Sequence, residues 1–536
     1  MAARLIRAML VLAMVLAASP VAADEIQQRL RERVEAASPV IRGESVRALA
    51  ALRRFCRTRD YRPAWTGSGA GSPLAALLAA VSRVEEHGLS PADYHLAPLQ
   101  ALAAGGDVVE RELLATDSYL TLAAHLLEGR VDPTSVEPDW TANRRERDLV
   151  AHLGQALAEK RIGPSLQELE PVAPGYQVLK QALAMYREAA MEGGWEPVPA
   201  GPALKLGEHS SRVRDLRVRL RATGFLAPGG GDPELYDTET EAAVAAFQRR
   251  MGLEADGVVG PATLRELNKR PGDRIEQIRA NMERWRWLPD DLGRRHVRVN
   301  IADYRLEARQ DGRVERSHDV IVGRTYRMTP IFSDRIAYLI FNPWWETPHN
   351  LARLDKLPAF RKDPESVQRL GFDVLDRNGR KVDPAGINWG DYSKGDFPFR
   401  LRQRPGPLNA LGQVKIMFPN KHNVYLHDTP AHELFERTER AFSSGCVRVA
   451  DALGLSEWLL AQTPGWNRSR IDGAVASGEE TRVDLPTSVP VHILYFTAVV
   501  DPDGSLRLIN DIYTRDARLS AALAAPPPGP GESQAP

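Results

Sequence analysis

The spacing of apolar residues changes along this chain of 536 residues, and that change constrains the fold more than any other feature of the sequence. In residues 26–200 apolar positions recur at intervals of three and four, for example over Val109–Glu128, which is typical of amphipathic helices. After about residue 295 they alternate with polar positions, as in Val297, Val299 and Ile301, which is typical of strands. Length and pattern together predict a multidomain α+β protein with about three domains.

The composition excludes several classes of protein. Hydrophobic residues make up 43% of the chain, which is too many for a disordered protein. Lys plus Arg and Asp plus Glu both number 70, so no overall charge attracts a nucleic acid or an anionic membrane. The two cysteines, Cys56 and Cys446, are too few for a disulfide framework or a thiolate-rich zinc site.

The first 23 residues have the layout of a signal peptide. Arg4 and Arg7 precede the apolar run Ala8–Ala18, and small residues lead to Ala23. The run is about half as long as a membrane-spanning helix requires. We therefore expect cleavage after Ala23 and export of the mature protein, with a retained anchor as the weaker alternative.

Residues 24–200 are predicted to form a helical scaffold domain that carries no chemistry. Aromatic and basic residues gather at Phe55, Arg57, Tyr61, Arg62 and Trp65, and histidines lie in the segment Glu86–His95. The two histidines lack carboxylate or thiol neighbours at metal-binding spacing. Packed turns explain these residues better than a site does.

A second unit runs from Leu206 to Asn268. Val213, Leu216, Val218 and Leu220 form one predicted helix face, and Asp237 or Thr238 is the predicted N-cap of the next helix. The order of a leucine-rich helix, Thr-x-x-Ala-Val-x-x-Phe-Gln and Asp-Gly-Val-Val-Gly resembles the small three-helix peptidoglycan-binding domain of cell-wall enzymes. A helical spacer without a ligand is the alternative.

Residues 274–520 are predicted to form a β-rich domain that begins with a linking helix. Strand candidates include 336–341, 413–418, 423–427 and 491–500. A stretch of about fifty residues, 348–399, interrupts them, and a loop of that length is usually functional or disordered. Residues 521–536 are expected to be a disordered Pro-rich tail.

One passage of the β-rich domain carries reactive groups. If residues 424–427 form a strand, Tyr425 and His427 point to one face, and His427 is the natural base for the Cys446 thiol. Arg448 could stabilise a thiolate, hold a substrate carboxylate or pair with Asp451. A buried structural cysteine remains the alternative on residue chemistry alone.

The pattern His-x(15)-Ser-x-Gly-Cys-x-Arg on an exported β-rich domain resembles the catalytic motif of L,D-transpeptidases with a YkuD-type domain. The order of scaffold, binding module and catalytic domain with a lid-like insertion is similar to the large Gram-negative branch. The resemblance implies that Cys446 is the nucleophile, His427 the general base, and Ser443, Gly445 and Arg448 the other motif residues. Many members have His where this chain has Ser444, so a backbone carbonyl is expected to orient His427.

The resemblance further implies the reaction. Cys446 would form a thioester with a tetrapeptide donor stem and release D-Ala, with Tyr425 and backbone amides at Gly445 and Cys446 stabilising the oxyanion. A second stem's amine would then give a 3–3 cross-link, in the periplasm, with no metal or cofactor and with carbapenems as covalent inhibitors. The alternatives are an L,D-carboxypeptidase, a transpeptidase that anchors lipoproteins, and a non-catalytic wall-binding scaffold.

Overall fold

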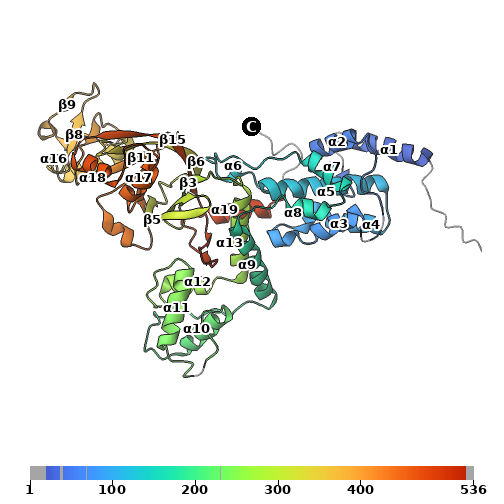
Figure 1. The fold of residues 1–536 in the computed structure, drawn as a ribbon. Helices are drawn as coiled ribbons and strands as arrows, with labels where there is room; N and C mark the ends of the chain where they lie inside the picture. The colour runs from blue at the N-terminus through green and yellow to red at the C-terminus, as the bar shows by residue number, and fades with distance from the viewer. Residues whose placement is uncertain (1–19, 37–39, 68, 70, 230, 527–536) are drawn as a thin grey trace, which may run out of the picture. The chain divides into compact units, whose positions relative to one another are not determined.

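The computed structural model describes residues 20–36, 40–67, 69, 71–229 and 231–526 (Figure 1). These residues form two compact units. The first comprises the chain up to Leu127 together with Glu146–Glu170, and the second comprises Glu128–Arg145 and Pro171–Ala525. Residues 1–19 of the expected signal peptide and residues 527–536 of the expected tail lie outside the described residues.

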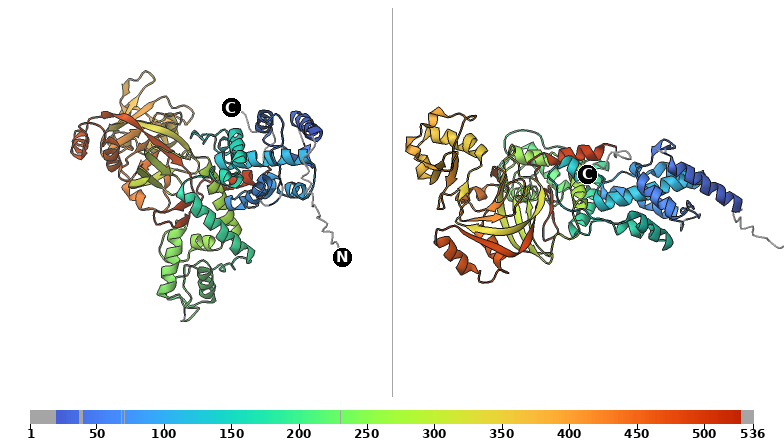
Figure 2. Two further views of the ribbon diagram at one scale, coloured as in Figure 1. Left: turned by 45° about the vertical axis from the view of Figure 1, so that its right-hand side comes forward. Right: turned by 90° about the horizontal axis from the view of Figure 1, so that it is seen from above.

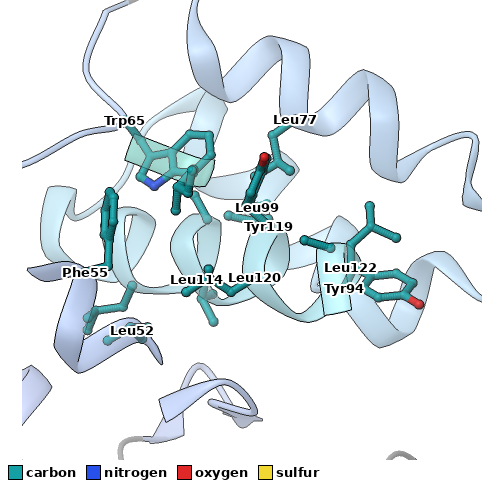
Figure 3. Close-up of a cluster of buried hydrophobic side chains, with 14 of the residues drawn as sticks. Leu52, Phe55, Trp65, Leu77, Tyr94, Leu99, Leu114, Tyr119, Leu120 and Leu122 are labelled. Carbon is teal, nitrogen blue, oxygen red and sulfur yellow. The ribbon is translucent and has the colours of Figure 1, made fainter. Parts of the chain in front are cut away.

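The first unit is helical, as the sequence predicts, but the predicted bounds of 24–200 were too wide, because residues 128–145 and 171–200 belong to the second unit. Its side chains pack around α5 (Val108–Glu128), and Figure 3 shows Trp65, Leu99 and Tyr119 within this core. The buried Glu112 carboxylate is satisfied by a segment distant in the sequence, since it accepts from the Trp65 amide at 3.0 Å. The other helices are α1 (Pro20–Glu35), α2 (Leu49–Thr58), α3 (Pro73–Val81), α4 (Leu96–Ala104), α7 (Leu149–Ala158) and α8 (Ile162–Gln167).

The residues that first suggested a site in this unit are part of its packing. Tyr61 and Trp65 are buried, and His95 lies between two carboxylates, 2.9 Å from Glu44 and 2.8 Å from Asp117. Cys56 is a free thiol, and burial raises its pKa to about 12. A thiol with such a pKa is inert at neutral pH.

The second unit contains the predicted three-helix module, made by α10 (Ser211–Ala222), α11 (Thr238–Arg250) and α12 (Pro261–Leu267). Asp237 is the N-cap of α11 and accepts from the Thr240 amide at 2.8 Å. The prediction for Val218 was wrong: its side chain is exposed, because a position five residues after Val213 has turned away from the buried stripe.

The module does not stand alone. Its buried residues belong to one hydrophobic cluster with residues of α9 (Pro174–Met191), α13 (Pro271–Arg286) and the hairpin β16 (Ala498–Val500) to β17 (Leu506–Leu508). Leu508, for example, is buried in the same cluster as Phe247 of α11. The module therefore shares its core with the elements around it.

The β-rich domain is built on one nine-stranded sheet, ordered β13-β5-β14-β12-β11-β6-β15-β3-β4, in which β4 also pairs with β5. That extra pairing closes all the strands but β13 into a barrel-like ring around a common core. The strands are β3 (Arg295–Asn300), β4 (Arg305–Gln310), β5 (Arg313–Gly323), β6 (Phe332–Phe341), β11 (Val414–Met417), β12 (Leu426–His427), β13 (Ala441–Ser443), β14 (Val447–Val449) and β15 (Thr481–Leu494).

Two strand predictions need correction. The candidate 491–500 is divided, because β15 ends at Leu494 and β16 pairs with β17 in a separate sheet. The candidate 423–427 is shorter than expected, since Asn423 has a φ of +54° and the pairing of β12 covers only Leu426 and His427. A left-handed residue cannot continue a strand.

The insertion between β6 and β11 folds around its own core. Phe360, Phe372, Trp389 and Phe397 are buried together, so these aromatic side chains serve the insertion itself. In the right-hand view of Figure 2 this part, in yellow and orange, forms a lobe beside the sheet. It contains β7 (Trp345–Glu346), α14 (His349–Leu351), the π-helical turn Ala352–Lys356, α15 (Leu357–Lys362), α16 (Ser366–Arg369), β8 (Phe372–Leu375), β9 (Lys381–Val382) and β10 (Arg400–Gln403).

The predicted start of the disordered tail, residue 521, is too early in the sequence. The last described helix, α19 (Arg515–Ala524), buries Leu519 and Leu523 against Val131 and Trp287. The two leucines are four residues apart and lie on one helix face, which holds residues 521–524 in the fold. The remaining α-helices described in the second unit are α6 (Pro133–Val136), α17 (Ala452–Leu460) and α18 (Arg468–Ala476).

Within the described ranges, no helix combines the length and the apolar character that crossing a membrane requires.

Candidate active site

Two neighbouring strands bring the motif residues together. β12 lies parallel to β14, with His427 opposite Arg448, and Cys446 immediately precedes β14. The Tyr425 and His427 rings lie 5.6 Å apart between centroids. Since residues two apart in an extended chain share a face, the phenol and imidazole face the same cavity as Cys446 and Arg448.

The turn before Cys446 is held by side-chain hydrogen bonds. The Ser443 hydroxyl donates to the Cys446 carbonyl at 2.5 Å and accepts from the Gly445 amide at 3.1 Å. The Thr329 hydroxyl donates to the Gly445 carbonyl at 2.9 Å. Gly445 has a φ of +118°, a conformation that other residues rarely adopt. Ser443 therefore positions the turn, and its hydroxyl is occupied there.

A backbone carbonyl orients His427, as the sequence predicted. The Nδ1 atom of His427 lies 2.5 Å from the Asp428 carbonyl. Because a carbonyl only accepts, Nδ1 carries the proton and Nε2 is left as the basic nitrogen. Burial lowers the pKa of His427 to about 3, and the positive charges of Arg448 and Lys415 act in the same direction. The imidazole is therefore neutral at neutral pH.

Lys415 is a residue of this site that sequence reasoning missed. It lies on β11 directly opposite His427, and its Nζ atom is 4.0 Å from the centroid of the Tyr425 ring. His427 is thus flanked by Lys415 on one strand and Arg448 on the other. The alternation of residues in this strand could have indicated Lys415, because a lysine between the buried Val414 and Ile416 must point away from the core.

The environment of Cys446 acts on its thiol in two directions. Burial raises the pKa of Cys446, whereas hydrogen bonding to Tyr425 and the positive charges of Lys415 and Arg448 act to lower it. Burial also raises the pKa of Tyr425 well above its ordinary value, so its hydroxyl stays protonated and can donate to a thiolate. The Cys446 Sγ atom also lies 3.8 Å from the Asn423 carbonyl.

Arg448 has no carboxylate partner within the described part of the chain, and its buried Nε atom lacks an acceptor. Pairing with Asp451 was one of three expected roles, but the Asp451 carboxylate caps α17 and accepts from the Gly454 amide at 2.9 Å. Burial lowers the pKa of Arg448 from its ordinary value. The remaining roles are stabilising a thiolate and holding a substrate carboxylate.

Cys446 and His427 line a cavity of about 1130 Å³, and the insertion forms one of its walls through Leu351, Leu354, Asp355 and Lys356. Arg327 connects that wall to the motif. Its guanidinium forms an ion pair with Asp355 at 2.6 Å and donates to the Ser444 hydroxyl at 3.0 Å. The residue next to Gly445 is therefore tied to the insertion.

Among the described residues, no group of three or more His, Cys, Asp and Glu side chains is arranged to hold a metal ion.

The site therefore belongs to a closed β domain that presents a thiol and a neutral imidazole in one cavity. Residues 294–481 match the family model described as "L,D-transpeptidase catalytic domain", and residues 209–267 match the model described as "Putative peptidoglycan binding domain". Residues 50–183 match a model described as a scaffold domain. The chain contains an L,D-transpeptidase catalytic domain and a peptidoglycan-binding domain, in an α+β architecture as the sequence predicted.

Relatives match parts of the chain. A protein of Haemophilus influenzae named "Putative L,D-transpeptidase" is 35% identical over 247 residues, which are 46% of this chain and 49% of that protein. An N-acetylmuramoyl-L-alanine amidase of Bacillus licheniformis is 43% identical over 67 residues, 12% of this chain and 19% of the amidase. The chain thus spans about half the length of the first relative and about a fifth of the second.

Among solved structures, an L,D-transpeptidase of Xylanimonas cellulosilytica is 20% identical, with a TM-score of 0.17, and the match covers 56% of this chain and 100% of that one. An L,D-transpeptidase of Stackebrandtia nassauensis is 14% identical, with a TM-score of 0.21, 56% of this chain and 97% of that one being covered.

Proposed function

We propose that this protein is an L,D-transpeptidase that forms 3–3 cross-links in peptidoglycan through a thioester on Cys446. The observation that carries the proposal is the neutral His427, whose Nδ1 is held by the Asp428 carbonyl so that Nε2 is the basic nitrogen, in the cavity that also holds the thiol. The Cys446 thiol transfers its proton to His427 and attacks the carbonyl that joins the third residue of a donor stem to D-Ala. The C–N bond breaks, and His427 returns the proton to the D-Ala amine.

The second half of the reaction mirrors the first. The side-chain amine of the third residue of another stem attacks the thioester, His427 takes a proton from that amine, and the Cys446 sulfur leaves as a thiol. The Tyr425 hydroxyl and the backbone amide of Cys446 stabilise the oxyanion in both halves. The Gly445 amide, which was also expected to do so, already donates to the Ser443 hydroxyl. Arg448 and Lys356 line the cavity as cations and suit the carboxylates of an acidic stem peptide.

Muropeptide analysis of isolated sacculi after incubation with the purified protein tests the proposal. Cross-linked dimers with 3–3 bonds are expected. Tripeptides without dimers would indicate an L,D-carboxypeptidase, a lipoprotein lysine as the preferred acceptor would indicate an anchoring enzyme, and an unchanged wall would indicate a scaffold. We place this activity in the periplasm, where the proposed substrate lies and to which the signal peptide expected from the sequence would direct the chain.

Lys415 is expected to stabilise the Cys446 thiolate. Replacing Lys415 with Met should raise the pH at which the thiolate forms and slow acylation by about tenfold, because a cation close to the sulfur is lost. Thiolate absorbance measured against pH gives the first quantity, and Cys56 does not interfere because its pKa is about 12.

Two further variants test the role of Lys415. Lys415→Arg should restore most of the effect, because it keeps the charge. Lys421→Met removes an exposed lysine beside the same cavity and should behave as the wild type. An unchanged thiolate titration in Lys415→Met would contradict the role.

The insertion is proposed to exclude water from the thioester, and the Asp355–Arg327 ion pair fastens it beside Ser444. Asp355→Ala should shift products from dimers to hydrolysed tripeptides by about two- to fivefold, the range for a partly exposed ion pair. Asp363→Ala breaks a comparable pair with Arg369 inside the insertion and should leave the ratio unchanged. Equal ratios in all three proteins would rule out the water-excluding role.

A further inference from the structure

A second large cavity lies in the same unit and shares no lining residue with the Cys446 cavity. Its volume is about 1030 Å³, and its walls come from α9, the module helices α10 and α11, and the β16–β17 hairpin. Neither the motif nor the proposed reaction uses it. We call it the Arg219 cavity after the charged residue in its wall.

Arg219 is a buried cation without a carboxylate partner among the described residues. Only 3% of its surface is exposed, and its guanidinium donates to the Leu267 carbonyl at 2.7 Å and to the Thr223 hydroxyl at 3.0 Å. Burial lowers its pKa to about 10, so it remains charged at neutral pH. A buried charge is normally balanced by an opposite one, which points to an anionic ligand.

Other groups in the cavity support an anionic ligand. Arg249 and Arg250 also line it, and neither forms an ion pair within the described ranges. Of the two nearby carboxylates, Asp501 pairs with Arg507 at 2.8 Å. Asp503 accepts from the Ser505 amide at 2.9 Å and offsets part of the charge of Arg250, which leaves Arg219 and Arg249. The cavity therefore has an excess of available positive charge.

Aromatic rings complete the walls. The Arg219 guanidinium lies 3.9 Å from the centroid of the Trp195 ring, and Tyr186 meets Trp195 edge to face. Phe225 packs edge to face on Phe247. Rings and arginines together suit a ligand that alternates carboxylates with short apolar groups.

We propose that the Arg219 cavity binds the acidic stem peptide of a peptidoglycan strand, as a contact separate from the catalytic cavity. The inference rests on the proposed function for the identity of the polymer. Stem peptides carry free carboxylates and methyl groups in short succession, whereas the glycan strand to which they are attached is largely neutral. A strand held here would raise the local concentration of stems at Cys446.

The shared core decides which experiment is informative. Deleting the module would expose the buried residues that it shares with α9, α13 and the β16–β17 hairpin, so a loss of binding would not be specific. Hydrogen–deuterium exchange on the full chain avoids this problem. The Cys446→Ala form prevents turnover, and a soluble disaccharide tetrapeptide serves as the probe.

The expected result is slower exchange both in the peptides that cover Tyr186–Trp195 and Arg219–Phe225 and in those that cover the Cys446 turn. Arg219→Gln and Arg249→Glu should abolish the first protection, keep the second, and weaken binding to sacculi by about tenfold or more. Arg249 is exposed, so that variant tests the cavity even if Arg219→Gln alters the fold. Arg265→Glu changes an exposed arginine of α12 outside the cavity and should match the wild type.

Each other outcome is decisive. Protection at the Cys446 turn alone overturns the cavity inference and leaves the proposed function intact. Protection at the Arg219 cavity alone overturns the proposed catalytic function and leaves the cavity inference intact. Protection at neither place overturns both. A neutral N-acetylglucosamine tetramer that protects the cavity as well as the muropeptide does would show that it binds sugars and would contradict recognition of the acidic stem.

Discussion

Cys446→Ala is expected to reduce the formation of cross-linked dimers to background, the largest effect of any single substitution. The acyl intermediate requires a nucleophile in the cavity, and the other cysteine is buried in the first unit with a pKa of about 12. Muropeptide profiles of sacculi treated with the variant measure the loss. Cys56→Ala, which removes the inert thiol, is the matched control and should remain active.

A mass measurement makes this prediction independent of turnover. A carbapenem should add its mass to the wild type and to Cys56→Ala but not to Cys446→Ala, because its strained amide carbonyl offers the thiolate an electrophile like that of the stem. Near-normal cross-linking by Cys446→Ala, or a stable adduct on it, would refute the proposed chemistry.

His427→Ala is expected to lower the rate of acylation by about 10² to 10⁴ while leaving the fold intact, the usual cost of losing a general base. His432→Ala, which removes an exposed histidine of a neighbouring turn, should leave the rate close to that of the wild type. Stopped-flow acylation by a chromogenic carbapenem measures the rates, and equal rates for the two variants would exclude a role for His427.

The pH dependence provides a second test of His427. Its pKa is lowered to about 3 in the folded protein, so the basic form is already present well below the ordinary histidine value of about 6.5. As pH falls, kcat/KM should therefore hold down to about pH 4 and decline only as His427 becomes protonated. A decline centred at the ordinary value would show that another group, or a solvated imidazole, acts as the base.

Much of this site could be predicted from local patterns. Alternation along 424–427 places Tyr425 and His427 on one face, and the missing motif histidine at Ser444 left a backbone carbonyl to orient the base, which the contact with Asp428 confirms. Asp237 was a predicted N-cap for the same reason: a cap depends on groups within a few residues. Such features are encoded over short distances, where the period of the chain decides which side chains meet.

The tertiary structure alone decided the rest. Lys415 joins the site because β11 pairs with β12 in a register that places Lys415 opposite His427. The sequence of neither strand specifies which strand it pairs with or in which register. The insertion was expected to be lid-like, and the structure shows that its aromatic residues form its own core while Asp355 and its neighbours form the wall of the cavity. The Arg219 cavity likewise needs α9, the module and the β16–β17 hairpin together.

The sequence by itself determined the order and type of the elements and the reactive groups, since local periodicity and turn chemistry govern them. The charges around those groups and the second cavity depend on packing between segments far apart in the chain, which only the folded structure specifies.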